Sequence, residues 1–248
     1  MKPKDQVLEV WGELACFARP PANVERFSYP VITPSAARGI YDAIYCKPNR
    51  DHTQAQFRWQ ITRIEVLAQP SYLALRRNEV KEKGPSPATV LQWMSGKKQP
   101  QPIWADGAEG GEKGRTQRQT MALKNVRYRL HAQVHPWPAM EDRLQSFEAQ
   151  FRRRAAQGKC IYQPCFGCRE FPAYFELVEP DAPPAQPVAW DEDLGLMVYD
   201  VFDLSEPGTC DSKPRISLFE AQVRAGVLEV PPYDSDAVLK ANGGATTC

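Results

Sequence analysis

Two tyrosines and a lysine stand together at the end of one predicted helix. Tyr41 and Tyr45 are four residues apart, so their phenols lie one turn apart on the same helix face, and Lys47 follows directly. Two phenols and an ammonium group suit proton transfer and charge neutralisation beside a polyanion. On spacing alone, tyrosines at this separation are more often packing residues than catalysts.

The stretch ending at Pro48 has the pattern of an amphipathic helix. Thr33 can accept from the free amides of a first turn, and Pro34 opens that turn without losing a hydrogen bond. Apolar residues then recur at helical spacing on one face, and Arg38 and Asp42 can pair four residues apart on another. We therefore expect a helix here that lies on a sheet.

The bulk properties indicate a globular chain with a sizeable core. It has 248 residues, of which 42% are hydrophobic, and no run of eighteen apolar residues. The N-terminus carries charges where a signal peptide would need an apolar region. Seven cysteines at irregular spacing fit reduced thiols better than a disulfide framework. We expect a cytoplasmic protein with no membrane partner.

The small net charge of +1 conceals an asymmetry along the chain. Eleven acidic and four basic residues follow residue 189, which leaves 19 acidic and 27 basic residues before it. The segment 115–169 is the most basic, with eleven Lys or Arg and three acidic residues. That density is typical of surfaces that contact phosphates, although a solvated basic face would look the same.

Hydrophobic periodicity predicts an α+β fold with the element order strand, helix, strand, strand, helix, strand. This is the βαββαβ order of ferredoxin-like (RRM-like) folds, an antiparallel sheet with both helices on one face. Besides the helix before Pro48, the predicted elements are strands at 6–17, at 56–68 with one bulge, at 122–134 and at 170–179, and a helix at 141–157.

The rest of the chain predicts a second, smaller unit and one long excursion. Residues 69–120 are rich in Pro, Gly, Lys and Arg and are expected to be a functional excursion or partly disordered. The excursion lies within a first domain at 1–180, which ends before a proline-rich linker. Strands at 194–202 and 216–230, the latter turning at 225–226, predict a C-terminal antiparallel β domain at 188–248.

Several kinds of chemistry are disfavoured by the sequence. It has no Walker A loop, no GxSxG elbow and no metalloprotease His-Glu pair. His131 and His135 share a strand face with Arg129, which disfavours a cation, and Cys165 and Cys168 form a single CxxC without a second pair. We therefore expect neither a metal site nor a cofactor.

Acid–base catalysis beside a basic surface remains, and RNA cleavage requires little more. The RNA 2′-hydroxyl is an internal nucleophile, so a protein need only align it, neutralise charge and exchange protons. Tyr45 could deprotonate that hydroxyl or protonate the leaving oxygen, while Lys47 or an arginine holds the phosphate. The side chains expected to bind RNA are Arg38, Arg127, Arg129, His131, Arg152, Arg153, Arg154 and Arg169.

Four sequence blocks resemble the Cas5d (Cas5c) proteins of the type I-C CRISPR system. They are LEVWGELACF at 8–17, VERFSYPVITPSAARGIYDAIYCKP at 24–48, RRNEVK at 76–81 and FRRRAAQGKCIYQPCFGCREF at 151–171. The TPSAARGI and GCREF blocks are specific, and the resemblance extends over nearly the whole chain.

The resemblance implies a RAMP protein with a ferredoxin-like N-terminal domain and a C-terminal β domain. Such a protein cuts the repeat hairpin of precursor CRISPR RNA without metal, leaves a 2′,3′-cyclic phosphate, and stays on the 5′ handle. It does so as a subunit of the Cascade complex, beside subunits of the Cas7 and Cas8c types. The family's catalytic tyrosine corresponds to Tyr45.

One position departs from the family pattern. Many relatives carry a Lys-His pair four residues before the phenylalanine of the second helix, where this chain has Ser146 and Phe147. Either other groups supply the acid–base chemistry, with Tyr45, Lys47 and the arginines first and His131 or His135 as substitutes, or cutting is weak. The alternatives are a non-catalytic subunit that binds the 5′ handle and a protein that binds duplex DNA or RNA without regard to sequence.

Overall fold

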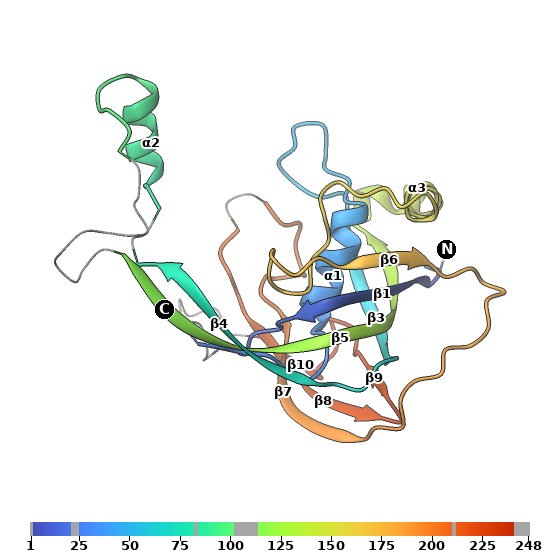
Figure 1. Cartoon of the computed structure of the whole chain (residues 1–248). Helices are drawn as coiled ribbons and strands as arrows, with labels where there is room; N and C mark the ends of the chain where they lie inside the picture. Colours follow the sequence, from blue (N-terminus) through green and yellow to red (C-terminus); the bar gives the residue numbers. More distant parts are fainter. Residues whose placement is uncertain (1, 21–24, 82–83, 102–113, 210–211, 241–248) are drawn as a thin grey trace. The chain divides into compact units, whose positions relative to one another are not determined.

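The structure is a computed structural model that describes residues 2–20, 25–81, 84–101, 114–209 and 212–240 (Figure 1). It divides into two compact units, one comprising Met1–Leu73 with Met121–Cys248 and the other comprising Ala74–Thr120. The first unit contains both helices and all the strands of the predicted βαββαβ order. The second unit falls within the predicted excursion.

The central sheet of the first unit has the ferredoxin-like strand order. It pairs β3 (Phe57–Val66) with β5 (Arg115–Pro136), β5 with β1 (Gln6–Ala15) and β1 with β6 (Tyr174–Leu177), always antiparallel. The register between β3 and β5 shifts between Ile61 and Arg63, which confirms the bulge. The α+β, ferredoxin-like fold class is therefore confirmed.

The first helix, α1 (Pro34–Ile44), begins as the sequence predicts. Thr33 Oγ1 accepts from the Ala36 amide at 3.2 Å, and Pro34 occupies the first turn. The helix ends at Ile44, before the expected stop at Pro48, because Tyr45 already has extended backbone angles (φ −152°, ψ 112°). Tyr45 is therefore the residue at which the chain leaves the helix.

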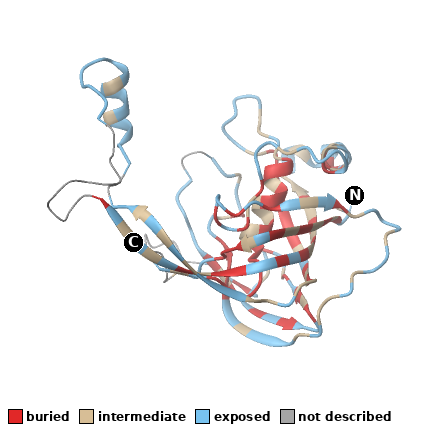
Figure 2. Cartoon of the chain, viewed as in Figure 1, coloured by how far each residue is buried: buried red, intermediate tan, exposed pale blue. Residues whose placement is uncertain are grey.

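The second helix packs beside α1 on the same face of the sheet. A 3-10 turn η1 (Pro138–Arg143) precedes α3 (Leu144–Ala156), so the predicted helix 141–157 begins three residues later than expected. Phe151 of α3 lies 5.4 Å from the Tyr41 ring of α1 and 4.7 Å from the Trp59 ring of β3, between ring centroids. The aromatic core thus joins both helices to the sheet, and Figure 2 shows the buried residues gathered in these elements.

The strands after the linker continue this sheet. β7 (Glu192–Asp200) pairs with β8 (Ser217–Arg224), β8 with β9 (Val227–Glu229) and β10 (Val238–Lys240), and β9 with β3. The predicted turn between β8 and β9 is confirmed, since Ala225 and Gly226 both have positive φ (48° and 74°). A boundary between domains near residue 188 stays a prediction.

Three elements pair near the excursion or lie in it. β2 (Arg26–Phe27) and β4 (Tyr72–Val80) both pair with β5, which extends seven residues before the predicted start of that strand. Helix α2 (Pro87–Met94) begins with a cap in which Ser86 Oγ accepts from the Thr89 amide at 3.2 Å, and none of its residues is buried. The middle of the excursion, 102–113, lies outside the described residues.

Candidate functional site

Tyr45 is held by its main chain on both sides. Its amide donates to the Tyr41 carbonyl at 2.8 Å, and its own carbonyl accepts from the Trp59 indole at 3.1 Å. The Tyr45 ring packs against Phe57 with 5.5 Å between centroids and is only 7% exposed. The phenol therefore has a fixed position at the end of α1.

Two arginines from the second helix region lie near enough to Tyr45 to act on its phenol electrostatically. Arg154 Nε donates to the Ile44 carbonyl at 2.7 Å, and Arg143 Nη1 donates to Gln56 Oε1 at 3.2 Å while its guanidinium lies 5.5 Å from the Phe147 ring centre. Within the described ranges, neither arginine has a carboxylate partner within 4 Å. Their positive charge is therefore available for an anion.

The surroundings of Tyr45 keep its phenol protonated. Burial raises the pKa of Tyr45, while the nearby cations Arg143 and Arg154 act in the opposite direction without cancelling that effect. A phenol above its ordinary pKa of about 10 carries its proton at neutral pH. A raised pKa suits donation of a proton to a leaving oxygen better than removal of a proton.

Lys47 lies on the exposed loop that follows. Its carbonyl accepts from the Gln56 amide at 2.8 Å, and the Gln56 side chain donates to the Pro48 carbonyl at 2.7 Å. Since the same Gln56 side chain accepts from Arg143, this glutamine joins the Lys47 loop to the arginine. We call Tyr45, Lys47, Arg143 and Arg154 the tyrosine cluster.

The helix position with the family's Lys-His pair holds no titratable group here. Ser146 is exposed, and Phe147 is buried with its ring 5.0 Å from that of Phe57. Arg143, one helical turn before Phe147, is the titratable side chain of this region that acts electrostatically on Tyr45 together with Arg154. The sequence interpretation missed Arg143, although its place in the basic segment 115–169 and its spacing of four residues from Phe147 were available signals.

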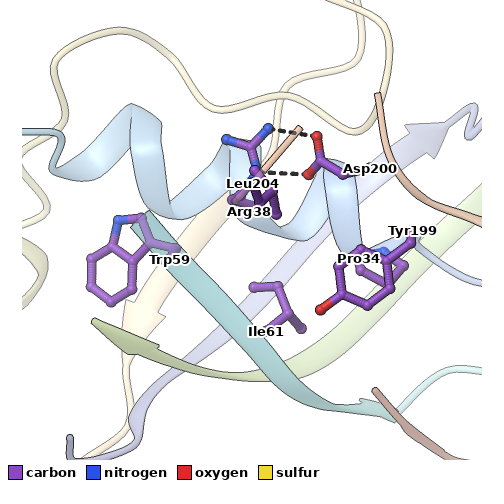
Figure 3. Close-up of a pocket in the computed structure, with 7 residues that line it drawn as sticks. All are labelled: Pro34, Arg38, Trp59, Ile61, Tyr199, Asp200 and Leu204. Carbon is purple, nitrogen blue, oxygen red and sulfur yellow. Dashed lines mark hydrogen bonds and ion pairs between the residues drawn. The ribbon is translucent and has the colours of Figure 1, made fainter. Parts of the chain in front are cut away.

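Arg38 is engaged elsewhere. Its Nε and Nη2 donate to the two carboxylate oxygens of Asp200 at 2.7 and 3.0 Å (Figure 3). Its Nη1 donates to Asp42 at 2.6 Å, the expected pair four residues apart. Burial opposes the Arg38 charge, but Asp200 and Asp42 more than compensate and raise its pKa. These contacts join α1 to β7.

A small cavity lies beside this ion pair. Arg38, Asp200, Trp59 and Tyr199 are among its lining residues, and its volume is about 10 Å³ (Figure 3). That volume is at the lower limit for one water molecule. The cavity therefore cannot hold a nucleotide.

Three predicted RNA-binding residues lie on the other face of the sheet. Arg127 and Arg129 both bond Glu9, Arg127 through Nε at 2.7 Å and Arg129 through Nη2 at 3.2 Å. His131 Nε2 lies 3.4 Å from Glu65 Oε1, and burial lowers the pKa of His131 despite that carboxylate. The structure does not bring these three residues to the tyrosine cluster.

The remaining predicted RNA contacts surround α3 and the loop after it. Arg152 pairs with Glu179 at 2.6 Å, Arg153 donates to Gln150 at 2.7 Å, and Arg169 is exposed. Among the described side chains, no three His, Cys, Asp or Glu groups gather as metal ligands. No helix in the described ranges has the length and apolar character needed to cross a membrane.

The fold and these surfaces define a class, the RAMP-like proteins with a ferredoxin-like sheet. Two solved structures have the same fold. One is titled a crystal structure of a CRISPR-associated protein (TM-score 0.61, 19% identity, 96% of this chain and 98% of that one). The other is a functionally uncharacterized protein from Streptococcus mutans (TM-score 0.58, 18% identity, 95% and 96%).

Sequence comparison identifies the family within that class. Residues 7–231 match the Cas5d family of CRISPR-associated proteins, and the chain belongs to this family. A relative from Mannheimia succiniciproducens is 37% identical over 239 residues, covering 94% of this chain and 97% of the relative. One from Thermus thermophilus is 35% identical over 241 residues, covering 90% of each. Both relatives are named CRISPR pre-crRNA endoribonuclease Cas5d.

Proposed function

We propose that this chain is a metal-independent endoribonuclease that cuts the repeat hairpin of precursor CRISPR RNA. Membership in the Cas5d family and the names of the two relatives support this reaction. The observation in this chain that carries the proposal is the buried Tyr45 at the end of α1, near two arginines that have no carboxylate partner among the described residues, and burial raises the pKa of its phenol.

The tyrosine cluster suits attack by the RNA 2′-hydroxyl on the adjacent phosphate. The 2′-oxygen forms a bond to phosphorus, the bond from phosphorus to the 5′-oxygen breaks, and a 2′,3′-cyclic phosphate remains. Tyr45 gives its proton to the departing 5′-oxygen, and the 2′-hydroxyl proton passes to water, from which Tyr45 is reprotonated. Arg143, Arg154 and Lys47 neutralise the charge on the nonbridging phosphate oxygens.

The partners follow from the same reaction. After cleavage the protein keeps the 5′ handle of the CRISPR RNA and acts as a subunit of a type I-C Cascade complex, beside subunits of the Cas7 and Cas8c types. The exposed Arg153 and Arg169 are suited to phosphate contacts outside the cleavage site, including contacts to duplex DNA. The pattern of seven cysteines favours a reducing, cytoplasmic location.

A second candidate function is that of a non-catalytic subunit that binds the 5′ handle. Phe147 favours it, because a buried phenylalanine occupies the helix position where relatives carry a titratable pair. In that case the tyrosine cluster would still bind a phosphate, but its phenol would transfer no proton.

Incubation of the purified protein with its cognate repeat RNA in EDTA separates the two functions. We expect a single cut, a product ending in a cyclic phosphate, and no cut when the nucleotide before the scissile phosphate is 2′-deoxy. A matched RNA with the 2′-deoxy substitution two nucleotides away is the control and should be cut normally. Tight binding of the repeat without any cut would contradict the nuclease and favour the handle-binding subunit.

A further inference from the structure

Two exposed side chains and one that is half-buried, Trp11, form a continuous row across the sheet face opposite the helices. Tyr174 of β6 stands directly opposite Trp11 of β1, and Trp11 stands directly opposite Arg127 of β5. Successive residues of a strand point to opposite faces, and the neighbours Val10 and Tyr128 are buried in the core on the helix side. Trp11, Tyr174 and Arg127 therefore share the outer face, and we call them the outer row.

The outer row is organised as a stack. The rings of Trp11 and Tyr174 are 6.4 Å apart between centroids with 27° between their planes, and the Arg127 guanidinium lies 5.9 Å from the Trp11 ring centre. Tyr174 is 53% exposed and the Arg127 side chain 56% exposed. Two aromatic groups and a planar cation thus offer solvent a connected surface that no core packing requires.

The next arginine on this sheet face, Arg129, is covered by the linker, and the exposed surface ends there. Arg129 lies two residues beyond Arg127 on the same face, and its Nη1 donates to the Pro183 carbonyl of the linker at 3.0 Å. Its side chain is only 14% exposed. The linker therefore contacts this sheet face at Arg129. The outer row lies beside that contact, at the beginning of β6.

The charge at the outer row is close to balanced. Glu9 bonds both Arg127 and Arg129, and Glu176 stands opposite Glu9 on the same face. A charged ligand would gain little general attraction from such a surface, whereas a flat π-system can stack on Trp11 or Tyr174 and on the guanidinium. The chemistry therefore favours a nucleobase over a phosphate group.

We propose that the outer row binds an unpaired nucleobase of the RNA, on a face of the sheet separate from the tyrosine cluster. Bases inside a duplex are stacked and unavailable, so the ligand is a base from a single-stranded part of the RNA outside the repeat hairpin. β6 is the terminal strand of the described sheet path, so a single strand of RNA can reach the exposed Tyr174 ring without crossing a further described strand. This inference rests on the proposed function in taking RNA as the ligand.

Binding of a single-stranded oligoadenylate of about ten nucleotides, within the usual site sizes, tests the outer row. We expect Trp11→Ala and Tyr174→Ala each to weaken binding about 5- to 150-fold, the range for loss of one aromatic stacking partner. Tyr174→Phe keeps the ring and should bind as the unmodified protein does. Phe202→Ala, which removes an aromatic ring that is 38% exposed beyond β7, is the matched control.

The salt dependence of oligoadenylate binding distinguishes a stacking contact from a phosphate contact, and cutting of repeat RNA tests the nuclease separately. A stacking contact predicts that the fold loss in Tyr174→Ala is the same at low and high potassium chloride, whereas a phosphate contact would fade at high salt. Unchanged oligoadenylate affinity in both alanine variants, as expected if the outer row instead contacts a protein, would overturn the proposal. A protein that binds oligoadenylate through the outer row but leaves repeat RNA uncut would contradict only the nuclease.

Discussion

Arg154 of α3 donates from Nε to the carbonyl of Ile44, the last residue of α1, at 2.7 Å. This contact fixes the second helix to the first at the residue before Tyr45. It satisfies a carbonyl that the end of a helix would otherwise leave without a partner, and it holds the guanidinium in the neighbourhood of Tyr45. The tyrosine cluster is therefore assembled by helix packing, and its predicted chemistry depends on that contact.

Tyr45→Phe should lower the rate of repeat cutting by about 10²- to 10⁴-fold, the usual contribution of a general acid. The phenylalanine ring can keep the contact with Phe57, so we expect RNA affinity and thermal stability to stay as they are. Single-turnover cutting and a separate binding titration measure the two effects. If affinity fell as much as the rate, Tyr45 would be a binding residue and its catalytic assignment would be wrong.

Arg143→Gln should weaken repeat binding and reduce its dependence on salt. Each cation that contacts a phosphate contributes roughly 0.7 to 0.9 to the slope of log affinity against log salt. Arg224→Gln is a suitable comparison, since Arg224 lies on β8, outside the tyrosine cluster, and donates to the Gln222 side chain at 3.0 Å. Binding titrations at several salt concentrations check this, and an unchanged slope in Arg143→Gln would remove Arg143 from the site.

Arg38→Met should destabilise the fold by about 3–5 kcal/mol, because it leaves Asp200 charged and almost fully buried without its partner. The double variant Arg38→Met/Asp200→Leu should recover part of that loss. Urea denaturation measures both. We also expect the folded fraction of Arg38→Met to bind RNA normally, so a selective loss of RNA affinity at full stability would show that Arg38 contacts RNA after all.

His135 makes the stability of the fold depend on pH. Burial, with a further contribution from Arg58, lowers the pKa of His135 below its ordinary value of 6.5, although Asp234 acts in the opposite direction. The unfolded chain therefore takes up this proton more readily than the folded chain. The stability that neutral His135 contributes is fully present above pH 6.5, the ordinary pKa of the unfolded chain. It is lost as the pH falls through the lower pKa of His135 in the folded protein.

His135→Gln should accordingly reduce the fall in melting temperature between pH 7 and pH 5. His131, whose pKa is also lowered by burial, is expected to retain its own share of that fall. Thermal melts of the two proteins at both pH values provide the measurement. An equal fall in the variant would mean that protonation of His135 does not oppose folding.

Local signals in the sequence predicted much of the fold. The Thr33 cap with Pro34, the bulge in β3 and the turn at Ala225 and Gly226 each depend on a few adjacent residues, and each is confirmed. β4 and α2 were missed because neither has a buried face to give a hydrophobic period. Periodicity reports burial, so it is silent about elements that lie in solvent.

The candidate site was less accessible to sequence reasoning. Tyr45 was identified through its place at the helix end and its block of family residues, but its neighbours Arg143 and Arg154 come from a segment about a hundred residues later. Arg127 was expected on a basic RNA-binding face, whereas Glu9, on another strand, occupies much of its hydrogen-bonding capacity. Such pairings depend on strand register and helix packing, which no short pattern records.

The pairing of β9 with β3 has a consequence for any attempt to shorten this protein. Arg63, Ile64 and Glu65 of β3 pair with Glu229, Leu228 and Val227, and the Val66 carbonyl accepts from the Val188 amide at 2.9 Å. A fragment ending at the linker would leave β3 as a bare edge with unpaired amides and carbonyls, the usual template for aggregation between chains. The C-terminal strands thus protect the N-terminal sheet from association with copies of itself.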